Sequence, residues 1–365
     1  MEDLGVTGPG VTRGFWAGRR VFLTGHTGFK GAWMAAWLTR MGAEVTGYAL
    51  APETDPNLWS LLRLPSVRSV IGDLNDRATL DRALAEARPE VILHLAAQAL
   101  VRRSYRDPVA TFASNVMGTV QLLDAARDCA DLRAIVVATS DKAYENVEQI
   151  WGYRETDPMG GRDPYSASKG ACEIAARSMA ASFFSDGGHP ARVATVRAGN
   201  VIGGGDWSED RLIPDIVRGC LGAQGSVTLR APGSVRPWQH VLEPLRGYLM
   251  VAERLHAGDA TAIGGWNFGP DRRDERAVGE VAEAVVAALG RGRILIDPAG
   301  ATLHEAKMLR LDCTKARVGL GWVPRLGFDE CIGLTADWYG GWAAGRDPAT
   351  LTLDQIAAYE ERTDR

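Results

Sequence analysis

Short apolar segments alternate with longer segments of helical spacing through the first half of the chain. The apolar segments are rich in Val, Ile and Leu and comprise residues 20–24, 44–48, 67–71, 91–95, 134–139 and 192–197. The helical segments between them are residues 29–41, 77–87, 109–128 and 164–184. Strands that are apolar throughout are typical of a parallel sheet covered by helices on both faces. The alternation therefore predicts an α/β fold built on a doubly wound, Rossmann-type parallel sheet.

In the second half of the chain, loop-forming segments interrupt the apolar and helical ones. This pattern predicts a smaller, irregular C-terminal substrate domain. Gly-, Pro- or Trp-rich loops are expected at 200–206, 230–237 and 264–273, because such segments commonly carry binding groups on a rigid scaffold. Helices are expected at 242–256, 278–289 and 328–344, and a surface helix or a frayed tail at 350–365. The expected division assigns residues 17–198 and about 240–268 to a dinucleotide-binding domain, and residues 199–239 and 269–345 to the substrate domain.

Composition and charge narrow the class of protein. The 365 residues include 41 basic and 45 acidic side chains, with no basic stripe, which argues against a nucleic-acid partner. No apolar run reaches the roughly 18 residues that a membrane span needs. The five cysteines form no C-x-x-C pair, so neither a zinc or other metal site nor a disulfide framework is expected. Because residues 1–18 also lack the pattern of a signal peptide, we expect a cytoplasmic protein without membrane association.

A glycine-rich turn joins the first predicted strand to the first predicted helix. Its sequence is Thr24-Gly25-His26-Thr27-Gly28-Phe29-Lys30-Gly31. Glycines at this spacing allow a tight turn and let backbone N–H groups approach a pyrophosphate at the helix N-terminus. The turn therefore predicts a dinucleotide site, to which Lys30 either adds charge or contributes nothing as a solvated side chain.

The ends of the next strands carry further candidates. The second strand ends without an acidic or arginine residue, so it does not choose between NAD and NADP. Asp73 is a candidate partner for an adenine amino group, or else an ordinary helix-capping residue. His94 is expected to be packed rather than catalytic, and Asn115 to support the site or cap a bend. The expected cofactor-binding residues are Gly25, Thr27, Gly28, Phe29, Lys30, Gly31, Asp73, Leu74, Ala96, Ala97, Gln98, Asn115, Tyr165 and Lys169.

Two short motifs carry the chemistry. Tyr165 and Lys169 are four residues apart on a predicted helix and project from one face. A nearby ammonium lowers the pKa of a phenol and turns it into a usable acid–base group, so we expect Lys169 to activate Tyr165. Ser140, Asp141 and Lys142 follow the fifth strand, at the sheet edge where α/β proteins bind ligands. This set places a hydroxyl donor, an acid and a candidate base side by side, unless Asp141 and Lys142 only form a surface turn.

With these motifs, the chain resembles the extended short-chain dehydrogenase/reductase family, and within it the sugar-nucleotide 4,6-dehydratases of the CDP-glucose type. The resemblance runs from about residue 20 to about residue 342. It is carried by the glycine turn, by Thr139-Ser140-Asp141-Lys142 and by four later segments. These are Trp151-Gly152-Tyr153-Arg154-Glu155, the run from Arg197 to Trp207, Arg236-Pro237-Trp238-Gln239-His240-Val241 and Gly265-Trp266-Asn267-Phe268-Gly269-Pro270.

The resemblance implies an NAD-dependent internal redox cycle on a nucleotide sugar. Tyr165 would take the proton of the sugar 4-hydroxyl, Ser140 would hold the 4-oxygen and Asp141 would protonate the departing 6-hydroxyl. Lys142 would either remove the C5 proton or stabilise the enolate oxygen. The substrate-binding residues that the resemblance indicates are Asn200, Arg211, Arg236 and Asn267, with weaker candidates at His304 and Glu305.

The resemblance also implies a homodimer formed through a four-helix bundle of the segments 109–128 and 164–184. Three other functions remain open at this stage, one of which is a 4,6-dehydratase that acts on a different NDP-hexose. A sugar-nucleotide 4-epimerase would share the glycine turn, Tyr165 and Lys169, but would not need the pair Asp141 and Lys142. A non-catalytic NAD-binding sensor would have no use for Tyr165, Lys169 and Asp141 together.

Overall fold

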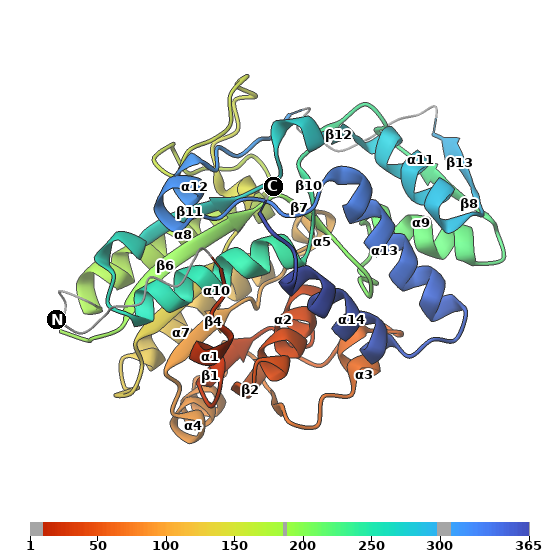
Figure 1. Cartoon of the computed structure of the whole chain (residues 1–365). Helices are drawn as coiled ribbons and strands as arrows, with labels where there is room; N and C mark the ends of the chain where they lie inside the picture. The colour runs from red at the N-terminus through yellow and green to blue at the C-terminus, as the bar shows by residue number, and fades with distance from the viewer. Residues whose placement is uncertain (1–9, 185–187, 298–307, 365) are drawn as a thin grey trace.

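A seven-stranded parallel sheet forms the centre of the computed structural model, which describes residues 10–184, 188–297 and 308–364 (Figure 1). Its strands are β1 (Arg20–Thr24), β2 (Glu44–Ala49), β3 (Arg68–Ile71), β4 (Val91–His94), β5 (Ala134–Ala138), β6 (Arg192–Ala198) and β11 (Gly264–Phe268). Their order is β11-β6-β5-β4-β1-β2-β3, and every neighbouring pair is parallel. The strand order reverses between β1 and β4, so ligands are expected at the carboxyl ends of these strands.

Helices cover both faces of this sheet. Successive residues of β1 point to opposite sides, with Val21 and Leu23 in one apolar core and Phe22 in the other. The first core includes residues of α2 (Phe29–Arg40) and α10 (Leu242–His256). The second core includes residues of α4 (Arg77–Ala87), α7 (Gly118–Ala126) and α8 (Pro164–Phe183). The buried, apolar strands predicted from the sequence thus form a doubly wound sheet.

The smaller elements lie beside the carboxyl edge of the sheet and at the ends of the chain. Three two-stranded pairs are formed by β7 (Asn200–Ile202) with β10 (Trp238–His240), β9 (Val235–Arg236) with β12 (Arg276–Ala277), and β8 (Ser226–Leu229) with β13 (Arg293–Ile296). On the right of Figure 1, β8 and β13 lie beside α9 (Leu212–Leu221) and α11 (Val278–Leu289). The other helices are α1 (Arg13–Trp16), α3 (Leu58–Leu62), α5 (Val101–Arg106), α6 (Pro108–Phe112), α12 (Thr314–Leu320), α13 (Phe328–Ala343) and α14 (Pro348–Glu360).

Four expectations from the sequence need correction. The strand expected at 67–71 is the edge strand β3, so its side chains are mostly exposed rather than buried on both faces. The helix expected at 109–128 consists of α6, a π-helical turn at Ala113–Met117 and α7. The first half of the loop expected at 264–273 is β11, paired with β6. The final helix α14 is neither frayed nor only superficial, because it packs on α2 and buries Leu351, Ile356 and Tyr359. None of the described helices is both long and apolar enough to span a membrane.

Candidate active site

The glycine turn forms a cradle at the N-terminus of α2. Gly25 has a φ of +77°, and a Cβ atom there would lie 2.7 Å from the backbone nitrogen of Ala96. A Cβ atom at Gly31 would lie 2.0 Å from the carbonyl oxygen of Gly25. Gly28 is the N-cap of α2 and supplies no side-chain hydrogen bond to the helix terminus. The turn therefore keeps the first N–H groups of α2 accessible to an anionic group such as a pyrophosphate.

The other residues of this turn point in different directions. The Thr27 hydroxyl donates to the carbonyl oxygen of Leu50 at 2.9 Å, so it ties the turn to the end of β2. Phe29 is half-buried and packs against the first core. Lys30 is also half-buried, and burial together with the charge of Arg211 lowers the pKa of its ammonium group to about 8. Because Lys30 also interacts with Asp141, its charge acts inside the site and is not that of a solvated surface lysine.

The expected adenine side of the cofactor site lies after β3. Asp73 is exposed, and its Oδ1 accepts hydrogen bonds from the backbone and side-chain nitrogens of Asn75. The N-cap of α4 is Asp76, so Asp73 is not the capping residue considered as the alternative. Leu74 is buried in the second core. The Tyr48 hydroxyl donates to the carbonyl oxygen of Asp73 at 2.7 Å and fixes the backbone of this turn.

The segment after β4 is held by Asn115. The Asn115 carboxamide accepts from the backbone nitrogen of Gln98 at 2.8 Å and donates to the Gln98 carbonyl oxygen at 3.0 Å. It also donates to the Ser168 hydroxyl at 2.8 Å, which links this segment to α8 beside Lys169. The neighbouring Ala96 and Ala97 are half-buried. Asn115 lies in the π-helical turn and is 1% exposed, so it supports the site rather than capping a solvent-facing bend.

His94 is packed, as expected from the sequence. Its ring nitrogens hydrogen-bond to the hydroxyls of Thr24 at 2.6 Å and Thr119 at 3.0 Å. Burial lowers the pKa of its imidazole to about 3, so the ring is neutral at physiological pH.

Tyr165 and Lys169 lie on the buried face of α8. This helix begins at Pro164 with Asp163 as its N-cap, whose carboxylate accepts from the Ser166 backbone nitrogen at 2.9 Å. Burial raises the pKa of the Tyr165 phenol to about 12, although Ser140 lies within hydrogen-bonding reach and opposes this shift. The Lys169 ammonium contacts the Ala138 carbonyl oxygen at 3.4 Å, and burial lowers its pKa. Burial is the largest influence on the pKa of the Tyr165 phenol, and the activation of the phenol by Lys169 stays a prediction.

After β5, Ser140 is the N-cap of a single 3₁₀ turn, Asp141–Ala143, and Asp141 is its first residue; we call residues 140–143 the β5 turn. The Ser140 hydroxyl donates to Asp141 Oδ1 at 3.0 Å and accepts from the Lys142 backbone nitrogen at 3.2 Å. Asp141 Oδ2 is buried and has no hydrogen-bond partner among the described residues. Burial raises the pKa of the Asp141 carboxyl, against the opposing charges of Lys142 and Arg236. Asp141 is therefore suited to hold a proton and to donate it to a ligand.

Cationic side chains from the smaller elements face this centre. Arg211 donates from Nη1 to Asp206 Oδ2 at 3.1 Å, and its charge also acts on Lys30 and Tyr165. Arg236 lies on β9 and acts on Asp141 through its charge. Asn200 is the first residue of β7, beside Trp238 of β10. Guanidinium groups suit the phosphate oxygens of a nucleotide sugar, so this side is the candidate substrate site.

Asn267 differs from the other candidates because it is fully buried. Its side chain donates to the carbonyl oxygens of Tyr153 at 2.9 Å and Asp312 at 3.1 Å and accepts from the Tyr144 hydroxyl at 2.7 Å. These contacts show that Asn267 joins three segments beside the site, and its expected contact with the substrate stays a prediction. His304 and Glu305 lie outside the described residues.

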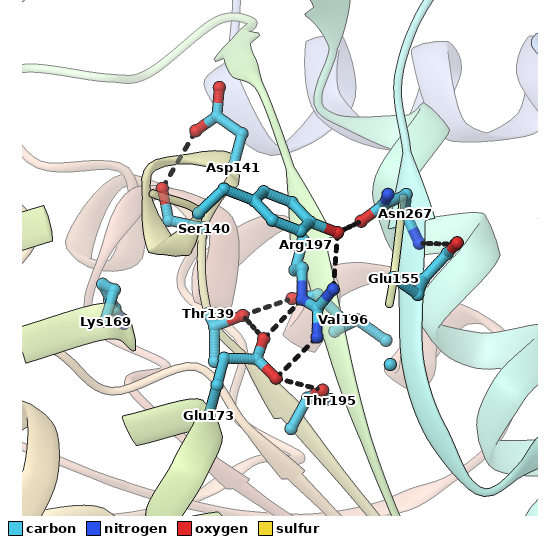
Figure 2. Close-up of polar contacts among 12 residues, drawn as sticks. Thr139, Ser140, Asp141, Glu155, Lys169, Glu173, Thr195, Val196, Arg197 and Asn267 are labelled. Atoms are coloured by element: carbon cyan, nitrogen blue, oxygen red, sulfur yellow. Dashed lines mark hydrogen bonds and ion pairs between the residues drawn. The ribbon is translucent and has the colours of Figure 1, made fainter. Parts of the chain in front are cut away.

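A buried network beneath the site was not anticipated from the sequence. Figure 2 shows Glu173 of α8 between Thr139, Thr195 and Arg197, all joined by hydrogen bonds. Arg197 also donates to the Tyr144 hydroxyl, which in turn donates to Asn267. The one signal in the sequence is the position of Glu173, four residues after Lys169 and on the same helix face.

Comparison with known proteins places this geometry among nucleotide-sugar enzymes. The sequence model of the GDP-mannose 4,6 dehydratase family matches residues 22–335. A CDP-glucose 4,6-dehydratase of Salmonella typhimurium is 47% identical over 359 residues, which cover 97% of this chain and 100% of that protein. A dTDP-glucose 4,6-dehydratase of Streptomyces antibioticus is 31% identical over 276 residues, or 75% of this chain and 77% of the relative.

Solved structures with the same fold include dehydratases and epimerases. A dTDP-glucose 4,6-dehydratase from Streptomyces venezuelae, with NAD and TYD bound, superposes with a TM-score of 0.73 at 24% identity. The match covers 90% of this chain and 99% of that one. A UDP-glucose 4-epimerase of Thermus thermophilus in complex with NAD gives a TM-score of 0.75 at 27% identity, covering 88% and 99% of the two chains. The fold is thus shared by both classes, and the side chains at the site must distinguish them.

Proposed function

The chain belongs to the GDP-mannose 4,6 dehydratase family, and from this membership we propose that it is a CDP-glucose 4,6-dehydratase that uses NAD. The identity of 47% with a CDP-glucose 4,6-dehydratase over nearly the whole chain supports the substrate. The observation that carries the reaction is the buried Asp141 carboxyl, with its free Oδ2, beside Ser140 and Tyr165. A 4-epimerase needs no acid at C6, whereas a dehydratase must protonate the hydroxyl that leaves there.

The glycine cradle, Asn115 and Lys169 are the residues that would hold NAD. The cradle offers backbone N–H groups to a pyrophosphate, and Lys169 contacts the carbonyl oxygen of Ala138 at the carboxyl end of β5. When bound, NAD would supply the hydride acceptor for C4 of the sugar and the hydride donor for C6. Because the cofactor is regenerated within each cycle, we expect the purified protein to retain NAD(H).

The protein residues then have separate tasks in the reaction. Tyr165 takes the proton of the 4-hydroxyl as the C4–H bond is broken, and Ser140 donates a hydrogen bond to the 4-oxygen. The 4-ketone acidifies the C5–H bond, from which Lys142 removes the proton. Asp141 delivers its proton to the 6-hydroxyl, which departs as water. The raised pKa of Asp141 suits this donor role, because it keeps the carboxyl protonated to higher pH.

We assign the two parts of the chain to the two ligands. Residues 17–198 and about 240–268 supply the sheet and its helices, and would bind the dinucleotide. Residues 199–239 and 269–345 carry Asn200, Arg211 and Arg236, and would bind the nucleotide sugar. Arg211, whose charge acts on Lys30, and Arg236, whose charge acts on Asp141, suit the diphosphate of that substrate.

We also propose that the protein is a homodimer and works in the cytoplasm. The dimer is supported by large apolar side chains exposed on the neighbouring helices α6 to α8. Val109 is 78% exposed, Met117 49% and Ile174 51%. Clustered exposure of this kind is typical of an interaction surface, and these helices are the ones expected to form a four-helix bundle with a second copy.

The test is incubation of the purified protein, without added cofactor, with CDP-glucose, dTDP-glucose, UDP-glucose and GDP-mannose. We expect CDP-glucose alone to lose one water and to give the absorbance of a 4-keto sugar in alkali. Conversion of another nucleotide sugar would retain the reaction but refute the substrate. A product that keeps its 6-hydroxyl would establish the 4-epimerase instead, and stoichiometric consumption of added NAD would contradict the internal redox cycle.

A further inference from the structure

The Glu173 carboxylate is the centre of the buried network. It is 5% exposed and accepts hydrogen bonds from three side chains, two on β6 and one immediately after β5. Its Oε2 accepts from the Thr195 hydroxyl at 2.6 Å, and its Oε1 accepts from the Thr139 hydroxyl. Arg197 donates to both carboxylate oxygens, from Nε at 2.7 Å and from Nη2 at 2.9 Å. This bidentate geometry fixes both the distance and the angle between α8 and β6.

The same network holds the β5 turn at both of its ends. Thr139 immediately precedes Ser140, and its backbone nitrogen donates to the Val196 carbonyl oxygen at 2.8 Å. Tyr144 immediately follows the turn, and its hydroxyl accepts from Arg197 Nη1 at 2.5 Å. The residues that carry the acid and the hydroxyl donor are therefore anchored before and after the turn to one ion pair (Figure 2).

Glu173, the acidic partner of the ion pair, lies on the same helix as Tyr165, which takes the proton of the 4-hydroxyl. Tyr165, Lys169 and Glu173 are spaced by four residues and lie along one buried face of α8. A shift of Glu173 relative to Arg197 would therefore move Tyr165 relative to Ser140 and Asp141. We propose that Glu173 and Arg197 are positioning residues, which set the distance between the β5 turn and Tyr165 in the reaction proposed above.

Energetics favour this role over a purely stabilising one. A buried ion pair seldom adds net stability, because desolvation of the two charges offsets their attraction. What the pair supplies is a fixed geometry, provided that both groups remain charged. Burial opposes the charge of Glu173, but the hydrogen bonds and charge of Arg197 hold its pKa below the ordinary value. The network therefore stays ionised throughout the physiological range of pH.

The test uses mild variants at the edges of the network, because the loss of Glu173 or Arg197 would leave an unpaired buried charge and prevent folding. Thr139→Val removes the hydroxyl that bonds to Glu173, and Thr139→Ser keeps it. Tyr144→Phe removes the hydroxyl that bonds to Arg197 but retains the ring. We expect the Val and Phe variants to lower kcat for CDP-glucose about 10²-fold, as small misplacements of reacting groups do. KM should change little, because Arg211 and Arg236 are untouched, and Thr139→Ser should restore kcat.

A control variant distinguishes a loss of kcat caused by a displaced β5 turn from one caused by lower stability of the whole protein. Glu90 accepts hydrogen bonds from Arg19 at 2.5 Å and from the Arg20 backbone at 3.1 Å, at the opposite end of β1 from the site. Glu90→Gln should lower Tm and leave kcat unchanged. The proposal is overturned if Thr139→Val and Tyr144→Phe keep the wild-type kcat, or if Thr139→Ser loses as much activity as Thr139→Val.

Crystal structures of the wild type and of Thr139→Val distinguish this proposal from the proposed function. If the wild type does not convert CDP-glucose, the proposed function is refuted. The crystal structures would still test whether the network sets the position of the β5 turn relative to Tyr165. We expect the Val variant to show Ser140 and Asp141 displaced relative to Tyr165. An unmoved turn would refute the positioning role whatever the substrate.

Discussion

Ser140 and Asp141 are joined by a hydrogen bond of 3.0 Å from the hydroxyl to Oδ1, which leaves Oδ2 of the same carboxyl without a partner among the described residues. One oxygen is thus held in place and the other is presented to the ligand. A buried carboxyl arranged in this way is costly for the folded protein, and such costs are common at sites that perform chemistry.

This arrangement predicts opposite effects of Asp141→Asn on stability and activity. Because burial raises the pKa of Asp141 in the folded state, the native protein loses stability as pH rises from the unfolded pKa through the folded one. Asparagine cannot ionise, so the variant should have a higher Tm than the wild type at pH 7 and a smaller dependence of Tm on pH. Loss of water from CDP-glucose should fall by at least about 10²-fold.

Calorimetry over a range of pH and mass spectrometry of the product check both effects. A variant less stable than the wild type at pH 7, but equally stable at pH 3, would show that Asp141 is ionised and stabilised in the native state.

Tyr165→Phe should abolish most turnover without unfolding the protein. The phenol is buried and its hydroxyl takes part in the reaction, so its loss should lower kcat by about 10²–10⁴-fold. The binding of NAD and of CDP-glucose should remain near the wild-type level, measured by titration calorimetry. Tyr105→Phe is the matched control, since Tyr105 is 41% exposed on α5, and it should keep full activity. Retention of activity in Tyr165→Phe would favour the non-catalytic sensor.

Gly31→Ala should damage the cofactor cradle. The added Cβ would lie 2.0 Å from the Gly25 carbonyl oxygen, so the turn or the start of α2 must move. We expect a loss of about 1–3 kcal/mol in the free energy of unfolding, together with loss of bound NAD from the purified protein. Gly340→Ala on α13 meets no atom within 4 Å and should stabilise the protein by about 0.5–1 kcal/mol. Denaturant unfolding and the absorbance of released cofactor measure the two effects.

The exposed apolar residues of α6 to α8 predict a dimer that charge can dissociate. Ile174→Lys combined with Met117→Lys would place two ammonium groups in the proposed interface. Burying these charges would cost free energy, because desolvation is not offset unless an acidic group pairs with them. We expect the variant to be monomeric at micromolar concentration by sedimentation. Val318→Lys on α12 introduces the same charge at an 83% exposed position and should leave the dimer intact. A monomeric wild type would contradict the proposed assembly.

The sequence predicted the sheet because its strands carry a local signal. Short segments rich in Val, Ile and Leu mark six of the seven strands, and residues 20–24 match β1 at both ends. The seventh strand was missed because β11 begins with Gly264 and Gly265 and has few β-branched residues, so it resembles a loop. Its pairing with β6 depends on residues some seventy positions earlier in the chain, which no local pattern contains.

The sequence predicts those candidate site residues that lie close together in short motifs. Tyr165, Lys169, Ser140 and Asp141 were identified by spacing and by position after a strand. The network of Glu173 and Arg197 could not be, because the two residues are 24 positions apart and meet only in the folded protein. The burial of the Tyr165 phenol, which raises its pKa, was also not predicted, since the spacing of Lys169 indicates a nearby charge but not the burial of the tyrosine.

The packing of α14 on α2 has a consequence for the order of events during protein synthesis. Glu360 accepts hydrogen bonds from Trp37 Nε1 at 2.9 Å and from Arg40 Nε at 3.1 Å, so the outer side of α2 is covered by a segment that lies 320 or more positions later in the chain. A ribosome adding about 5–20 residues per second needs on the order of tens of seconds to travel between these positions. Throughout that interval the nascent α2 lacks its cover, and its tryptophans are available to chaperones or to neighbouring chains. The packing of α2 is therefore completed only after α14 has been synthesised, although α2 itself is made early.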